Sequence, residues 1–77
     1  MQTITQTAAG TFNSTIAYAV RGATLGAGTA PITITDAAGR EILTLGALGV
    51  PVMLGSPVQA VGLISNGTFT KLNIFVE

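Results

Sequence analysis

The chain has no cysteine, no histidine and no tryptophan, and the first two absences each remove a class of function. Without cysteine it has no disulfide, no iron–sulfur cluster and no thiolate zinc site. Without histidine it lacks the side chain that most often binds metals and most often serves as a general base. The sequence therefore predicts a protein with no catalytic, cofactor-binding or metal-binding residues, which acts by binding and packing.

Charge is also scarce. Three basic residues balance three acidic ones, and charged residues make up 8% of the chain, where about 25% is usual for a soluble domain. Three scattered cations are too few to neutralise a run of phosphates, so no nucleic-acid partner is predicted. A neutral surface favours association. The competing interpretation is a monomer that its many threonine hydroxyls keep in solution.

The length allows one domain, residues 1–77, in which 1–9 is expected to form an extended arm. A chain this short buries only about 60–65% of its unfolded surface, so an isolated monomer would be marginally stable. Small domains usually gain stability from disulfides, metals or association. Since the first two are excluded by composition, association with other chains is predicted.

No membrane segment is predicted. The longest apolar stretch, Ile42–Leu54, has 13 residues and is interrupted by Thr44 and Pro51, whereas a membrane-spanning helix needs about 20. The first residues, Met1–Thr5, contain no positive region followed by an apolar run, so no signal peptide is expected.

Periodicity of two and frequent glycine predict an all-β fold. Ile16, Tyr18 and Val20 alternate with small or polar residues, as in a strand. Glycine and proline then break the chain every eight to twelve residues, which is typical of a small sandwich or barrel. We expect a small antiparallel β-sandwich or partly open barrel of six or seven short strands. Met1–Thr7 is expected to be a first strand, able to join a neighbour's sheet.

Two turns are predicted. Asp36–Gly39 has an aspartate that accepts backbone hydrogen bonds and a glycine that supplies positive φ, so Arg40–Leu45 should return as the partner strand. Asn66-Gly67 is the preferred pair for a two-residue type I′ hairpin, which would place Ile64 opposite Phe69.

This hairpin register divides the C-terminal segment into two faces. The face predicted to fill the core carries Val61, Leu63, Leu72, Ile74 and Val76. The face predicted to contact another chain carries Val58, Ile64, Phe69 and Phe75, with Met53 and Leu54 as further interface candidates. Lys71 and Asn73 lie on the second face, and an unpaired lysine is rare in a core but common at an interface rim.

Motifs for catalysis are lacking. Asp36, Glu41 and Glu77 each have a structural explanation, as turn starter, strand residue and terminus, and no partner acid is placed to form a hydrolase pair. The serines have no neighbouring base. The glycines of Gly22–Gly28 are not followed by the lysine or helix of a phosphate-binding loop. A flexible connector between strands explains them.

The Thr-, Ala- and Gly-rich composition, with a predicted closing hairpin that contains Val58–Val61, Ser65–Thr68 and Ile74, resembles small virion proteins of tailed bacteriophages, of the head decoration (cement) or head-fibre and tail-accessory type. The resemblance extends over the whole chain and involves no diagnostic motif. It implies a symmetric oligomer, often a trimer, made in the host cytoplasm and seated on the capsid surface, where it contacts its own copies and the major capsid protein or another virion protein.

Three functions are therefore considered. The first is a capsid decoration subunit that stabilises the shell by adding interface to it. The second is a small β-barrel binding module for a peptide, glycan or small ligand, which the shortage of aromatic residues disfavours. The third is a tail or tube component that polymerises head to tail, which requires an open rather than a closed interface.

Overall fold

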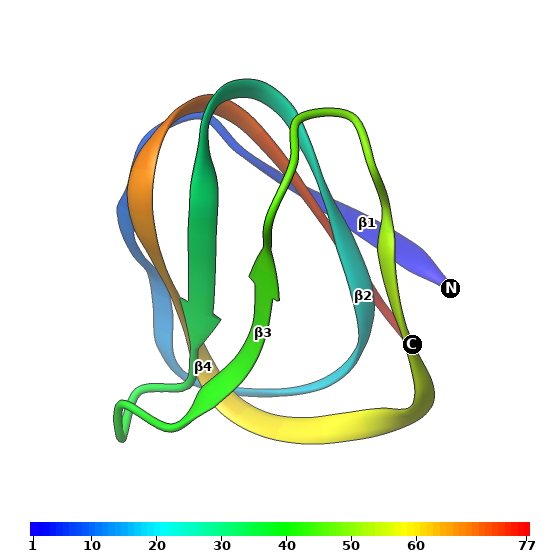
Figure 1. Cartoon of the computed structure of the whole chain (residues 1–77). Coiled ribbons are helices and arrows are strands. Elements are labelled where there is room, and N and C mark those ends of the chain that lie inside the picture. The colour runs from blue at the N-terminus through cyan, green and yellow to red at the C-terminus, as the bar shows by residue number, and fades with distance from the viewer.

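The computed structural model describes all 77 residues and contains strands, turns and loops but no helix, which confirms the all-β prediction. The strands are β1 (Gln2–Gln6), β2 (Gly10–Thr35), β3 (Glu41–Leu45) and β4 (Val52–Val76). They form one open antiparallel sheet in the order β1-β4-β2-β3 (Figure 1). No helix is available that could span a membrane.

The strands are fewer and longer than the sequence suggested. β2 has 26 residues and β4 has 25, because the glycine-rich segments expected to be loops are bends within continuous strands. In β4, for example, the register moves from Met53 opposite Gly22 to Val58 opposite Val20, so the intervening residues of β4 form an irregularity. Such bulges bend a strand and increase its twist without ending it.

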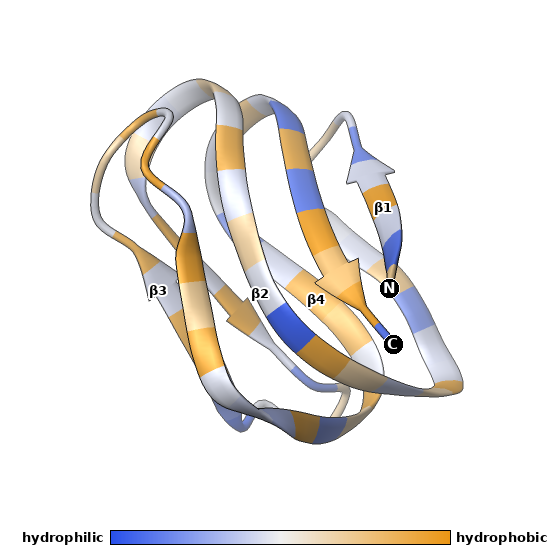
Figure 2. Ribbon diagram, turned by 90° about the vertical axis from the view of Figure 1, so that its right-hand side faces the viewer, coloured by the Kyte–Doolittle hydropathy of each residue, from blue (hydrophilic) through white to orange (hydrophobic).

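Because of these bends, β2 and β4 pair with each other along two separate stretches. Val20 in the middle of β2 lies opposite both Val58 and Val76, and Ser65 in the middle of β4 lies opposite both Gly10 and Ile34. The sheet consequently coils around its own interior, as Figures 1 and 2 show from two sides. The coiling encloses a single core.

The core is built from thirteen buried hydrophobic residues of β2, β3 and β4. They are Val20, Ala23, Leu25, Ile32, Ile34, Leu43, Leu45, Ala60, Leu63, Phe69, Leu72, Ile74 and Val76. The predicted burial of Leu63, Leu72, Ile74 and Val76 is confirmed. The accessible surface is 3942 Å², close to the roughly 4,300 Å² expected of a compact monomer of this mass, so the chain folds back on itself efficiently.

The hairpin predicted at Asn66-Gly67 is wrong. β4 continues through both residues, with Asn66 opposite Thr33 of β2, and Ile64 lies opposite Thr11 and Thr35 rather than Phe69. Gly67 has φ +135°, and a Cβ there would lie 2.5 Å from Ile32 Cδ1. The glycine therefore permits a close approach of β2 to β4, a role that the sequence does not distinguish from a turn.

Phe69 faces the core, although the hairpin register predicted it on the opposite face. Gly28 of β2 lies opposite Phe69 and Ala27 lies opposite Lys71, so Thr70 is an extra residue on β4. A one-residue insertion exchanges the faces of a strand. Phe69 is therefore only 6% exposed, whereas beyond Thr70 the alternation returns with Leu72 and Ile74 buried.

Val61 shows the opposite difference from Phe69: it is exposed where the pattern predicts burial. It was predicted in the core, yet 56% of it is exposed. Gly62, with φ +79°, separates it from buried Leu63, and the register jumps from Ala17 opposite Val61 to Asn13 opposite Leu63. The positive φ of Gly62 departs from extended geometry, so the simple alternation that would place Val61 on the same face as Leu63 ends there. Val61 thus belongs to the outer surface.

β1 is an integral edge strand of its own chain. Its five residues pair in unbroken register with the end of β4, from Gln2 opposite Val76 to Gln6 opposite Leu72. Gln6 is buried, where its Nε2 donates to Gly10 O (3.0 Å) and its Oε1 accepts from Ser65 Oγ (2.8 Å). The predicted first strand is therefore present, and it extends its own sheet.

Candidate functional site

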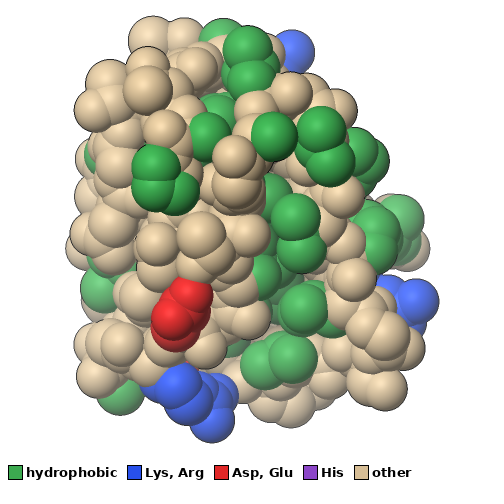
Figure 3. All heavy atoms as spheres, viewed as in Figure 1, with side chains coloured by type: hydrophobic (Ala, Val, Ile, Leu, Met, Phe, Trp, Pro, Cys, Tyr) green, Lys and Arg blue, Asp and Glu red, His purple; other side chains and the backbone are tan.

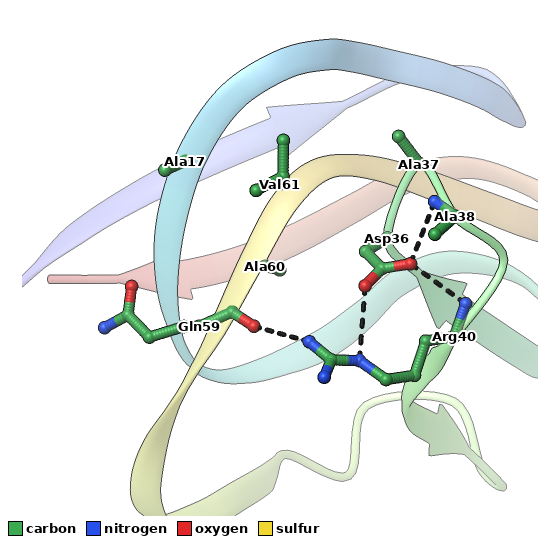
Figure 4. A pocket seen from close by; sticks show the side chains of 8 residues that line it. All are labelled: Ala17, Asp36, Ala37, Ala38, Arg40, Gln59, Ala60 and Val61. Atoms are coloured by element: carbon green, nitrogen blue, oxygen red, sulfur yellow. Dashed lines mark hydrogen bonds and ion pairs between the residues drawn. The ribbon is translucent and has the colours of Figure 1, made fainter.

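The largest hollow of the surface is an open groove of about 690 Å³ where the turn between β2 and β3 faces β4 (Figure 4). Three segments line it: Ala17 of β2, the turn itself and residues 59–61 of β4. Its lining residues are Ala17, Asp36, Ala37, Ala38, Arg40, Gln59, Ala60 and Val61. Short apolar side chains form most of the groove; Asp36 and Arg40 lie together at one end, and the Gln59 side chain points away from them (Figure 4).

The end of the groove that carries Asp36 and Arg40 is the turn between β2 and β3, held by hydrogen bonds within the turn and to β4. Asp36 Oδ1 accepts hydrogen bonds from the backbone N–H of Ala38 (3.0 Å) and Arg40 (2.9 Å). Its Oδ2 pairs with Arg40 Nε at 3.2 Å, and Arg40 Nη2 donates to Gln59 O at 2.8 Å (Figure 4). Gly39 has φ +85°. The turn predicted at Asp36–Gly39 is thus confirmed, and the carboxylate is engaged in holding it.

Replacing Asp36 by alanine is expected to lower the free energy of unfolding by about 2–3 kcal/mol, because two backbone N–H groups lose a charged acceptor. Asp36→Asn retains one acceptor oxygen and should cost less. Arg40→Met should cost less than Asp36→Ala, because the Arg40 side chain is 64% exposed and the buried Asp36 carboxylate keeps both of its backbone N–H donors. Chemical denaturation of the three variants measures the order; equal losses for Asp36→Ala and Arg40→Met would contradict this role.

The apolar end is fixed by β4. Val61 lies directly opposite Ala17, so their side chains share the outer face of the sheet. Val61 O accepts a hydrogen bond from Ala37 N at 2.9 Å, which holds the turn against β4. A Cβ on Gly62 would lie 2.9 Å from Ala37 Cβ, so this close packing depends on the glycine. The groove can receive a small apolar group between alanine methyls and Val61.

The residues predicted for an interface do not form one face. Phe69 is buried in the core, and Leu54 is half-buried and packs against it. Val58, Ile64 and Phe75 are half-buried, and only Met53 is largely exposed, at 53%. The structure brings two of them together: Met53 and Phe75 lie on either side of Gly22 in one cross-strand row.

This row forms a second apolar surface. A Cβ on Gly22 would lie 2.7 Å from Met53 Sδ, so the methionine side chain reaches over the glycine. Lys71 behaves similarly, with its Cγ and Cδ each 3.1 Å from a Cβ on Gly26. Two glycines of β2 thus provide flat backbone that side chains of β4 cover.

Exposed apolar side chains are numerous for so small a surface. Seven large ones are exposed: Met1, Phe12, Ile16, Leu48, Val50, Met53 and Val61. On the face shown in Figure 3, hydrophobic side chains (green) are dispersed among tan backbone and polar atoms; charged groups are few, with the blue ones at the edges and a red one within the lower left. The sequence pattern predicts neither the groove nor the row formed by Met53, Gly22 and Phe75. Both depend on irregularities of strand pairing, which the alternation of residues does not reveal.

No protein family, curated protein or solved structure matches the chain.

Proposed function

We propose that this protein is a non-enzymatic structural subunit that works by associating with other chains, of the capsid decoration kind that its composition resembles. The observation that supports the proposal is the outer surface. It combines seven exposed large apolar side chains with only six charged residues in the whole chain. Exposed apolar side chains mark contact sites where they lie together, as Met53 does with half-buried Phe75 beside Gly22.

The distribution of charge supports the same proposal. Arg21 pairs with Glu77 at 2.8 Å, and Arg40 pairs with Asp36 at 3.2 Å. Thr44 Oγ1 donates to the carboxylate of Glu41, which leaves Lys71 as the one charged side chain with no such partner. Little repulsion therefore opposes the approach of a second chain.

In this proposal, the subunit stabilises a capsid shell by mass action. A chain that binds the assembled shell and its own copies, but not the dissociated capsid protein, shifts the equilibrium toward the shell. In this role the buried core of the coiled sheet would stabilise the subunit, and the apolar side chains on its outer surface would contact other chains. The partners are copies of itself and a capsid or other virion protein.

Sedimentation velocity and native mass spectrometry at micromolar concentration test the association. We expect an oligomer, and a melting temperature that rises with protein concentration, since association stabilises only the folded chain. Met53→Gln, which replaces an exposed apolar side chain, should weaken assembly with little change in the melting temperature of the dissociated chain. A monodisperse monomer with a concentration-independent melting temperature would reject the proposal.

A small-ligand or peptide-binding module is the second candidate, and the groove favours it. Its volume of about 690 Å³ lies within the range of about 300–1,000 Å³ typical of ligand sites. Amide NMR shifts confined to Ala17, Ala37, Ala38 and Val61 on titration with short apolar peptides would support this function. Shifts spread over the surface, or none, would reject it.

A further inference from the structure

β1 is an open edge of the sheet. Its only neighbouring strand is β4, and Figure 2 shows it on the right of the molecule, beside the C-terminal part of β4. An edge strand presents a row of N–H and C=O groups that have no partner within the sheet. A strand of another chain can pair with such a row.

β1 lacks the features by which proteins usually block an edge. Gln2–Gln6 contains no charge, no proline and no glycine, and its register with β4 has no bulge. The opposite edge, β3, begins at Glu41 directly after Arg40, and its pairing with β2 is irregular at Thr35. Charges and bulges discourage pairing between edges. Of the two edges, β1 is therefore the accessible one.

The sequence of β1 reads the same in both directions: Gln2-Thr3-Ile4-Thr5-Gln6. An antiparallel copy centred on Ile4 would place Gln2 opposite Gln6, Thr3 opposite Thr5 and Ile4 opposite Ile4. Threonine pairs across strands form favourable contacts, and no like charges meet. In a strand, the backbone N–H and C=O groups of every second residue point to the same side. In the register centred on Ile4, the groups on the free side of β1 in one copy therefore lie opposite the corresponding groups of the other copy.

The two faces of β1 also match in this arrangement. Ile4 lies opposite buried Ile74 and is half-buried against the core, whereas Thr3 and Thr5 are exposed on the other face. The symmetric register brings Ile4 against its own copy on the core side. Apolar surface would thus continue from one core to the next, and the threonines would remain on the outer side.

We infer that two copies of this chain associate through β1, antiparallel about a two-fold axis at Ile4, so that two four-stranded sheets become one continuous sheet. In such an isologous contact each copy occupies the other's edge, and growth through this edge stops at two. The inference goes beyond the proposed function, because it depends on β1 alone and not on which assembly the protein joins.

Disulfide cross-linking tests the register directly, because the chain has no cysteine of its own. In the inferred dimer Ile4 faces its copy at a Cα separation of about 4.5–5.5 Å, within the 4.4–6.8 Å of natural disulfides. Ile4→Cys should therefore form a covalent dimer on mild oxidation at micromolar concentration. Gln2→Cys is the matched control, since its copy would lie about 13 Å away along the strand, and it should remain uncross-linked.

A second pair of variants uses exposed positions, where substitution does not touch the core. Thr3→Cys and Thr5→Cys should each fail to cross-link alone, but an equal mixture of the two, allowed to exchange subunits, should give the mixed covalent dimer. Absence of cross-linking in both Ile4→Cys and this mixture overturns the inference. If the wild-type chain is nevertheless oligomeric, association occurs through another surface and the proposed function stands; if it is a monomer, both fall.

Discussion

Replacing Gly28 by alanine is expected to lower the free energy of unfolding by about 2–6 kcal/mol, a large part of the stability of this domain. Gly28 has φ +148°, and a Cβ there would lie 2.5 Å from Phe69 Cα and 2.6 Å from Thr68 O. Both atoms are backbone of the paired strand, so neither can move without separating β2 from β4. The conformational cost is about 1–3 kcal/mol and overpacking adds about 1–3 kcal/mol, against a total stability of about 4–11 kcal/mol for a domain of this length.

Two other glycines allow the cost of a positive φ to be separated from the cost of overpacking. Gly10 has φ +122° but no atom within 4 Å of an added Cβ, so Gly10→Ala should show the conformational cost alone. Gly46 has neither a positive φ nor a close neighbour, so Gly46→Ala should be nearly neutral. Denaturant unfolding of the three variants gives the order. If Gly28→Ala is no worse than Gly10→Ala, β2 and β4 are not in close contact at this point.

The sequence predicts local features of this fold well and the path of the long strands poorly. Asp36–Gly39 forms the expected turn because its signal is local: one carboxylate and one glycine suffice. Asn66-Gly67 has an equally strong local signal, yet β2 lies across it and β4 runs straight through. A glycine can serve a turn or a close approach, and only the partner strand decides between them.

The same reason limits prediction of the site. Alternation correctly assigns Leu72 and Ile74 to the core, because the irregularities along this segment add residues to β2, whereas β4 itself pairs with β1 in unbroken register. It fails at Phe69 and Val61, which lie beyond the irregularities at Thr70 and Gly62. The change of face expected at Asn66-Gly67 occurs at Thr70 instead, so Phe69, which lies between the two positions, is assigned to the wrong face. The groove lined by Val61 could therefore not be found from the pattern alone.

This reversal leads to opposite expectations for two aspartate substitutions. Phe69→Asp should prevent folding, because Phe69 is 6% exposed and is one of the thirteen core residues. Truncating a buried phenylalanine costs about 3–5 kcal/mol, and an unpaired buried charge adds to that loss. Phe69→Leu, which keeps an apolar side chain, should still fold with a lower melting temperature, showing that the charge and not the position is the cause.

Val61→Asp should leave the fold intact, because Val61 is 56% exposed and surface substitutions usually change stability by no more than about 0.5 kcal/mol, with strand propensity adding up to about 1 kcal/mol. The backbone bond from Ala37 N to Val61 O does not involve the side chain and should persist. Circular dichroism and thermal melts compare the two variants, and sedimentation reports whether the charge in the groove weakens association. A folded Phe69→Asp, or a Val61→Asp that unfolds as completely, would mean that β4 keeps simple alternation through Gly62 and Thr70, with Val61 inside the sheet and Phe69 outside.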